Sequence, residues 1–84
     1  MTGHEAKVGV FVRSLVDFSG VPKGTMGIID EDYGTGIMVA WNLPDQSLPK
    51  DYMQCREKYT KLGERPLRDG FDKETELQFL ELPS

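Results

Sequence analysis

Valine recurs at every second position in residues 7–13, residues 37–41 are a run of apolar residues, and a further short apolar run lies between them at residues 25–30. Because successive side chains of a strand point to opposite faces, these stretches predict three short strands. In the first stretch, Phe11 takes the face opposite to the valines. The residues expected to share buried faces are Val8, Val10 and Val12 in the first stretch and Ile37, Val39 and Trp41 in the third.

Turn-forming residues separate the predicted strands. Gly24 and Gly27 bracket the start of the second strand, where glycine permits positive φ or the close approach of another strand. Residues 31–36 are rich in turn formers and predict a hairpin connection. Pro44 ends the third strand, since proline cannot donate to a central ladder. Residues 64–72 have no periodic pattern and are expected to form a loop.

The period changes in residues 51–62, which predict one amphipathic helix. Asp51 is a suitable cap at its start, and Gly63 lies just past its end. The apolar stripe of this helix consists of Tyr52, Cys55, Tyr59 and Leu62.

Residues 76–82 favour a closing strand. In that strand Leu77 and Phe79 share one face, and Leu80 and Leu82 share the other. A helix that begins near Thr75 is the alternative, because Leu, Glu and Gln favour helices.

Several short strands, a long first connection, the Gly-x-x-Gly entry to the second strand and a late closing strand resemble the SH3-like barrel. The resemblance covers residues 7–41 and about 71–82. It implies one all-β domain over residues 1–84, with about five short strands and a helix-containing insertion at residues 42–70. Barrels of this kind include Tudor domains, ribosomal and transcription-elongation modules, accessory subunits of larger enzymes and plasmid-borne dihydrofolate reductases, so the fold alone does not select a function.

Dihydrofolate reductase activity is not expected. The active site of the plasmid-borne enzymes contains a Val-Gln-Ile-Tyr segment at the pore of a tetramer. The nearest counterpart here, Leu77-Gln78-Phe79, lacks the tyrosine that follows.

The composition is that of a small globular domain, with 38% hydrophobic and 29% charged residues. No apolar run is long enough to span a bilayer, and the first residues lack the form of a secretory signal, so the expected compartment is the cytoplasm. The single cysteine excludes an internal disulfide. The formal net charge of −4 disfavours general nucleic-acid binding.

Loop aromatics beside acidic residues form the first candidate site. SH3-like barrels bind peptides or modified side chains in aromatic-lined grooves between loops. The residues here that suit a basic peptide or cationic side chain are Asp17, Phe18, Glu31, Asp32 and Tyr33. Trp41 and Phe79 are preferred as core residues, whereas Phe18 and Tyr33 fit the core and a binding role equally well.

A locally basic segment forms the alternative site. Residues 50–68 carry six basic and three acidic residues, whereas the flanking segments are acidic. Its cations, which could meet RNA or an acidic partner, are Lys50, Arg56, Lys58, Lys61, Arg65 and Arg68. The competing interpretation is an ordinary solvated face, because surface charge pairs are weak and common.

Neither a metal site nor a catalytic site is expected. His4 and Cys55 are single ligands, and the run Asp30–Asp32 lacks the spacing of a calcium loop. Cys55 lies on the apolar stripe, which favours a buried thiol over a nucleophile. The sequence therefore predicts a cofactor-free, non-catalytic module that binds a protein or peptide. An RNA- or ribosome-associated barrel, an accessory subunit and a homo-oligomer stay open as alternatives.

Overall fold

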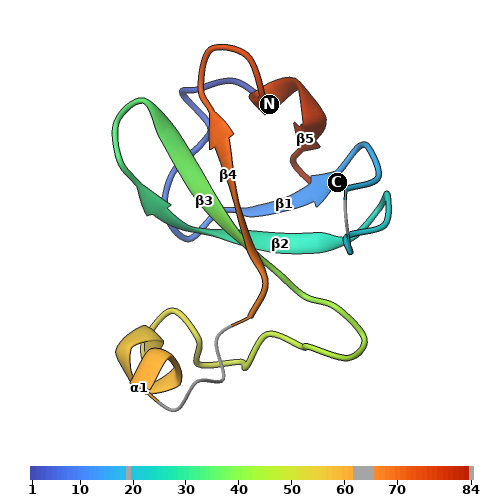
Figure 1. The fold of residues 1–84 in the computed structure, drawn as a ribbon. Coiled ribbons are helices and arrows are strands. Elements are labelled where there is room, and N and C mark those ends of the chain that lie inside the picture. Colours follow the sequence, from blue (N-terminus) through green and yellow to red (C-terminus); the bar gives the residue numbers. More distant parts are fainter. Residues whose placement is uncertain (19, 62–65, 84) are drawn as a thin grey trace.

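The computed structural model describes residues 1–18, 20–61 and 66–83. One antiparallel sheet dominates it, with the strand order β4-β3-β2-β1-β5. Its strands are β1 (Phe11–Ser14), β2 (Met26–Asp32), β3 (Gly36–Trp41), β4 (Arg68–Asp72) and β5 (Leu80–Glu81). A helix, α1 (Arg56–Lys61), and a 3₁₀ turn, η1 (Leu77–Phe79), complete the described elements. The sheet curls into a half-barrel (Figure 1), which confirms the prediction of a mainly β fold with five short strands.

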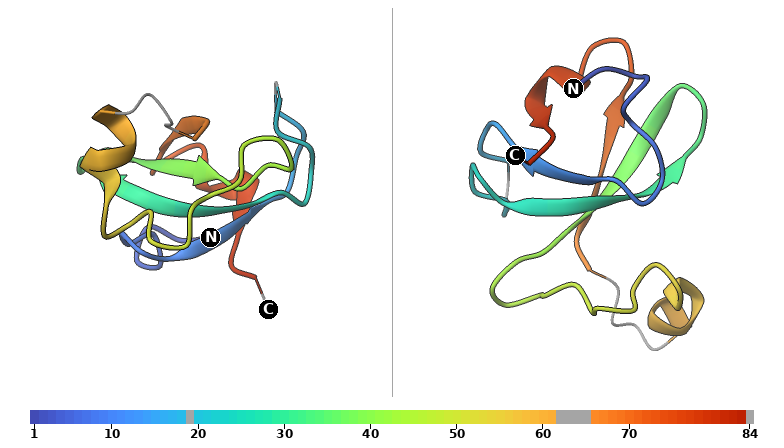
Figure 2. Two further views of the ribbon diagram at one scale, coloured as in Figure 1. Left: turned by 90° about the horizontal axis from the view of Figure 1, so that it is seen from below. Right: turned by 180° about the vertical axis from the view of Figure 1, so that it is seen from behind.

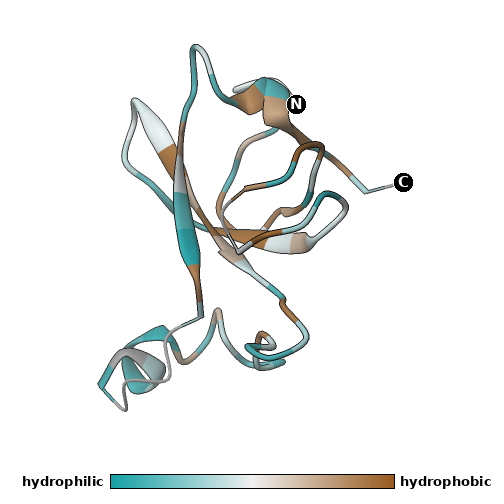
Figure 3. Cartoon of the chain, turned by 45° about the vertical axis from the view of Figure 1, so that its right-hand side comes forward, coloured by the Kyte–Doolittle hydropathy of each residue, from teal (hydrophilic) through white to brown (hydrophobic). Residues whose placement is uncertain are grey.

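The inner face of the curled sheet holds the main core. Ile37, Val39 and Trp41 of β3 are fully buried there, which confirms that they share one face. Figure 3 shows apolar positions along the strands and polar positions on α1. Gly27 allows β2 to approach Trp41 and the backbone of β3 closely. A Cβ at this glycine would lie 2.8 Å from the indole and 2.8 Å from the Ala40 carbonyl oxygen.

The first strand begins later than predicted. β1 starts at Phe11, and Gly9 adopts a φ of 93°, which breaks the alternation before it. Val8 is consequently 48% exposed, so its predicted place on the buried face is wrong. Val12 is fully buried as expected, whereas Phe11 points to the opposite face and is 57% exposed.

The predicted loop at residues 64–72 is wrong for its second half, where β4 pairs with β3. The register joins Ile37 to Phe71 and Met38 to Gly70. Phe71 is the buried apolar residue of this strand. Its other residues are charged or glycine, so the sequence shows no alternation of apolar and polar positions here. The connection that leaves the sheet therefore ends at residue 67, earlier than the predicted boundary at residue 70.

The predicted helix at residues 51–62 is shorter than expected. Regular helix covers only Arg56–Lys61, and turns occupy residues 51–54. Asp51 does not cap the helix as predicted, because regular helix begins only at Arg56. The Asp51 carboxylate accepts a hydrogen bond from the Tyr59 hydroxyl at 2.5 Å. Leu62 and Gly63 lie outside the described residues.

The chain closes with a turn and a very short strand. Of the predicted strand at residues 76–82, only Leu80–Glu81 pairs, with β1. Residues Leu77–Phe79 form η1, so the prediction that Leu77 and Phe79 share one face of a strand is wrong. Leu77 and Leu80 are buried in the core, and Phe79 packs against it in a partly buried position. Leu82 is 40% exposed. A 3₁₀ turn aligns residues three apart, which explains this change of faces.

The connection between β3 and β4 lies outside the half-barrel. Figure 1 shows α1 below the strands, and both views of Figure 2 also place this helix to one side of the sheet. Among the described residues, no helix is long and apolar enough to cross a membrane.

Candidate functional site

A second, smaller apolar cluster lies on the outer face of the sheet. Ile28 of β2 and Ala40 of β3 point away from the main core and are covered by Tyr52, which is 5% exposed. Leu48, Met53 and Tyr59 pack against this cluster from the same connection. The β3–β4 connection therefore forms a partial cover over the outer face.

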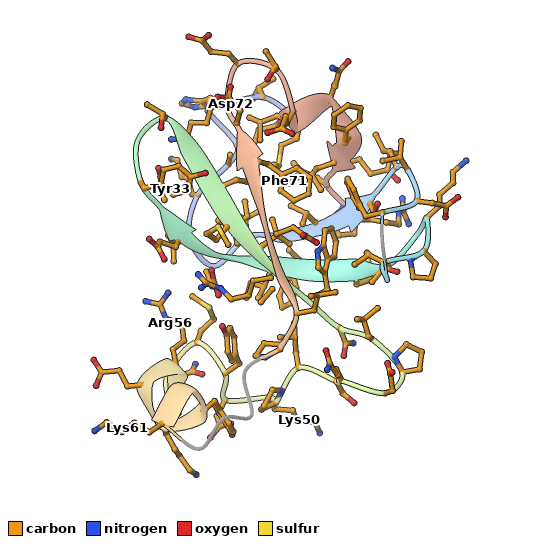
Figure 4. All side chains as sticks on the ribbon, in the orientation of Figure 1. Tyr33, Lys50, Arg56, Lys61, Phe71 and Asp72 are labelled. Carbon is orange, nitrogen blue, oxygen red and sulfur yellow. The ribbon has the colours of Figure 1, made fainter. Side chains whose placement is uncertain are left out.

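A buried carboxylate anchors this cover. Asp30 of β2 is 1% exposed and accepts a hydrogen bond from the Tyr52 hydroxyl at 2.7 Å. Arg68 of β4 donates to the same carboxylate through Nε at 2.7 Å and Nη2 at 2.8 Å. Arg56 of α1 donates to the Asp30 backbone carbonyl (Figure 4 shows Arg56 between α1 and the sheet). Because a bidentate arginine satisfies a buried carboxylate well, this cluster joins β2, β4 and the connection.

Tyr52 and Arg68 in this cluster each keep one protonation state at neutral pH. Burial, followed by the hydrogen bond to Asp30, raises the pKa of Tyr52 to about 12. The hydrogen bond to Asp30 also raises the pKa of Arg68. Tyr52 is therefore a neutral hydrogen-bond donor and Arg68 a cation throughout the physiological range.

An apolar groove of about 480 Å³ separates the cover from the outer face of β1 and β2. Phe11, Met26 and Ile28 line it from the sheet, and Leu48, Tyr52 and Met53 line it from the connection. Its volume and apolar lining fall in the range of ligand-binding clefts. Phe11 is the most exposed large apolar residue among those described, and the register places it opposite Ile28.

Two described residues of the groove lining, Asn42 and Lys50, carry side-chain N–H donors. Lys50 is its charged residue, and Asn42 and Lys50 both belong to the wall formed by the connection. The Asn42 side-chain oxygen accepts the Leu48 backbone N–H at 3.0 Å, and this bond uses the acceptor of that amide.

The structure does not bring the predicted loop aromatics together. Phe18 follows β1 and Tyr33 follows β2, so they lie at opposite ends of β2. Phe18 packs in a half-buried position against Phe71 and Trp41, with ring centroids 5.4 Å and 6.1 Å away. Tyr33 is 50% exposed and covers Gly36, since a Cβ there would lie 2.5 Å from its hydroxyl.

The acidic residues predicted beside these aromatics already contact other parts of the chain. Asp17 accepts the Lys23 backbone N–H at 2.7 Å, and Glu31 pairs with Arg68 at 3.2 Å. Asp32 pairs with Lys73 at 2.9 Å; this contact, followed by the Gly34 N–H, lowers the Asp32 pKa. A role for Asp17, Phe18, Glu31, Asp32 and Tyr33 in partner binding stays a prediction.

The predicted basic face is distributed over several environments. Lys50 lines the apolar groove, Arg56 points toward Asp30, and Lys58 lies 5.6 Å from the centre of the Tyr59 ring. Lys61 lies away from the sheet in Figure 4, and Arg65 lies outside the described residues.

A second, polar pocket of about 380 Å³ brings three residues of the predicted basic face together, Arg56, Lys61 and Arg68. It is lined by Arg56, Lys61, Arg68, Asp30, Glu31, Glu57 and Tyr52. Among its described lining residues three basic groups face three acidic groups, so these residues give the pocket no positive excess of the kind that phosphate binding requires.

Within the described ranges, no three His, Cys, Asp or Glu residues gather in a way that could hold a metal ion. Cys55 is half-buried between the turns and α1. A scan against protein-family models and searches of curated proteins and of solved structures find no match to this chain.

Sequence reasoning missed the groove because it looked for aromatics in loops. The signal that points to it was the alternation in the first strand, which placed Phe11 opposite the buried valines. An outward aromatic beside an outward Ile28 marks an apolar outer face. The opposite wall of the groove is formed by the β3–β4 connection, and no local sequence pattern predicts where that connection lies.

Proposed function

We propose that this chain is a small, non-catalytic protein-interaction module that binds a peptide or protein partner in the apolar groove. The observation that carries the proposal is the exposure of Phe11, 57%, on a strand that borders a groove with an apolar floor. A soluble domain rarely leaves a large aromatic exposed beside further apolar surface unless that surface meets a partner.

The buried Asp30 cluster also supports a binding role. A groove binds more tightly when its walls are held before the ligand arrives, because less conformational entropy is lost on association. Tyr52 serves both purposes, since its ring lines the groove and its hydroxyl is held by Asp30. The polar groups of the Asp30 cluster are engaged with one another, which favours a structural over a catalytic role for them.

We further propose that the half-barrel is an SH3-like barrel. Its first strand lies between the second and the fifth, and a 3₁₀ turn comes directly before the last strand. This arrangement is typical of SH3-like barrels, many of which are binding modules, although the fold alone does not select a ligand.

Selection from a random peptide library on the purified protein tests the proposed function. We expect enriched peptides to lose about tenfold or more in affinity against Phe11→Ser, because a central aromatic anchor carries much of the binding energy. The unfolding free energy of Phe11→Ser should stay within about 1 kcal/mol of wild type, since the side chain is largely exposed.

Val8→Ser is the matched control, because Val8 is an exposed apolar residue that does not line the groove. Equal binding to wild type, Val8→Ser and Phe11→Ser would assign the partner surface elsewhere. Failure to enrich any peptide would count against a peptide-binding module.

A further inference from the structure

We propose that the groove selects peptides in which a bulky apolar side chain lies next to a carboxylate. This inference rests on the proposed function and names the chemistry of the partner. It follows from the polar lining: Lys50 and Asn42 offer an ammonium and an amide NH₂, and none of the described residues that line the groove is acidic. An apolar cavity with a cation and an amide NH₂ in its lining is complementary to an apolar group that carries an acceptor.

The donors are available because neighbouring groups are occupied elsewhere. The Asn42 side-chain oxygen is bound by the Leu48 N–H, and no described group accepts a hydrogen bond from its Nδ2. Asp51 follows Lys50 directly, but its carboxylate accepts the Tyr59 hydroxyl on the α1 side. Among the described ion pairs, none joins Lys50 to Asp51, the acid closest to it in the chain.

The other nearby acids do not reverse this charge. Asp30 lies behind Tyr52 and forms a pair with Arg68. Asp45 belongs to the exposed turn closed by the bridge between Leu43 and Gln46, outside the groove lining. Charges farther than about 8 Å are largely screened at physiological salt, so the net charge of −4 has little effect on a contact within the groove.

The apolar floor explains why the carboxylate, more than the anchor, should set specificity. Met26 and Met53 line the groove from opposite walls, and methionine adapts to anchors of different shape. Ile28 and the Tyr52 ring supply the rigid part of the floor. Aliphatic and aromatic anchors should therefore bind comparably, whereas loss of the carboxylate removes the contact with Lys50 and Asn42.

Three capped hexapeptides that share a central Phe-Leu test the inference. The first has Asp on both sides of the pair, the second has the isosteric Asn, and the third has Lys. Binding is followed by backbone amide shifts in the full chain, with peptide added to about 1 mM, near −4 kcal/mol of binding free energy. We expect the Asp peptide to bind about fivefold more tightly than the Asn peptide, because exposed charge pairs contribute modestly.

Lys50→Gln should abolish this difference and leave the affinity for the Asn peptide unchanged. Lys23→Gln is the matched control, since Lys23 is an exposed lysine of the β1–β2 connection and does not line the groove. It should keep the full preference. High salt should also reduce the preference in wild type, because screening weakens an exposed pair.

Three outcomes would overturn the inference. Equal affinity for the Asp and Asn peptides, with shifts at Ile28 and Met53, would remove the carboxylate preference and leave the proposed function intact. Tightest binding of the Lys peptide, with shifts at Asp17 and Tyr33, would assign recognition to the acidic loops. If none of the three peptides binds while library-selected peptides do, only the inference fails; if neither binds, both proposals fail.

Discussion

The two faces of the single sheet are buried in different ways. The inner face is closed by the sheet itself, which curls until Trp41 meets Phe71 with ring centroids 6.1 Å apart. The outer face is covered by a connection that leaves the sheet, and this cover is held through one buried carboxylate, Asp30. Dispersed apolar contacts stabilise the first face, whereas the second depends on a few polar contacts and leaves a groove open beside Phe11.

This difference suggests a division of roles. A closed apolar core tolerates little change in volume and serves mainly stability. A face with a partial cover has apolar surface left over, and that surface can meet a partner. Substitutions on the two faces should therefore separate stability from binding, and three of them can break or sharpen the comparison.

The largest effect is expected from Asp30→Asn. This change leaves the Arg68 guanidinium without its buried carboxylate partner, so the unfolding free energy should fall by about 3 kcal/mol. Urea unfolding measures this loss. Asp45→Asn, at an exposed position, should have almost no effect.

A double variant, Asp30→Leu with Arg68→Met, sharpens this prediction, because apolar residues often replace a buried ion pair at little cost. It should recover much of the stability and still weaken peptide binding, since Tyr52 loses its hydrogen-bond acceptor. A loss below about 1 kcal/mol in Asp30→Asn would show that the cover does not depend on this pair.

An intermediate effect is expected from Phe18→Ala. The ring extends the inner core by its contacts with Phe71 and Trp41, so its removal should lower the unfolding free energy by about 2 kcal/mol. Tyr33→Ala, at a 50% exposed position, should cost about 1 kcal/mol or less. Thermal unfolding compares the two. A Phe18→Ala variant that keeps wild-type stability but loses partner binding would restore the loop-aromatic site.

The smallest effect is expected from Tyr52→Phe and depends on pH. At pH 9 the variant should be about 1 kcal/mol less stable than wild type, because the hydrogen bond to Asp30 is lost. The folded chain holds the Tyr52 proton up to a pKa of about 12, whereas an unfolded tyrosine releases it near about pH 10. The stabilisation is thus fully present below about pH 10 and declines as the pH rises toward 12.

Urea unfolding at several pH values between 9 and about 12 measures this convergence of wild type and Tyr52→Phe. The Tyr33→Phe control retains Tyr52 and should keep the wild-type dependence. A constant gap across this range would mean that the Tyr52 hydroxyl is not buried against Asp30.

The prediction from sequence was strongest where local pattern and tertiary role agree. The period of two in a strand places Ile37, Val39 and Trp41 on one face of β3, and that period is a local property of the chain. The pattern was weakest at β4, where Phe71 is the buried apolar residue and charged residues occupy the outer positions. Such a strand forms because it can pair with β3. The residues of β4 alone do not contain that information.

The candidate site could be predicted only in part for the same reason. The alternation in the first strand predicted that Phe11 points away from the buried valines. The apolar stripe of the predicted helix indicated that Tyr52 packs on another surface. Neither pattern could say that Asp30 and Arg68, 38 positions apart, meet the Tyr52 hydroxyl. For Phe18 the sequence left a core position and a binding role equally open, and the fold packs its ring against Phe71.

By itself, the amino-acid sequence determined the class of fold, the inward face of β3 and the turns around β2, because these depend on neighbours in the chain. The tertiary structure alone decided which residues cover the outer face and where the groove lies. Those features arise when the long β3–β4 connection returns to the sheet and pairs a carboxylate of β2 with an arginine of β4. Contacts of this kind bring together residues far apart in the chain and leave no period for local patterns to reveal.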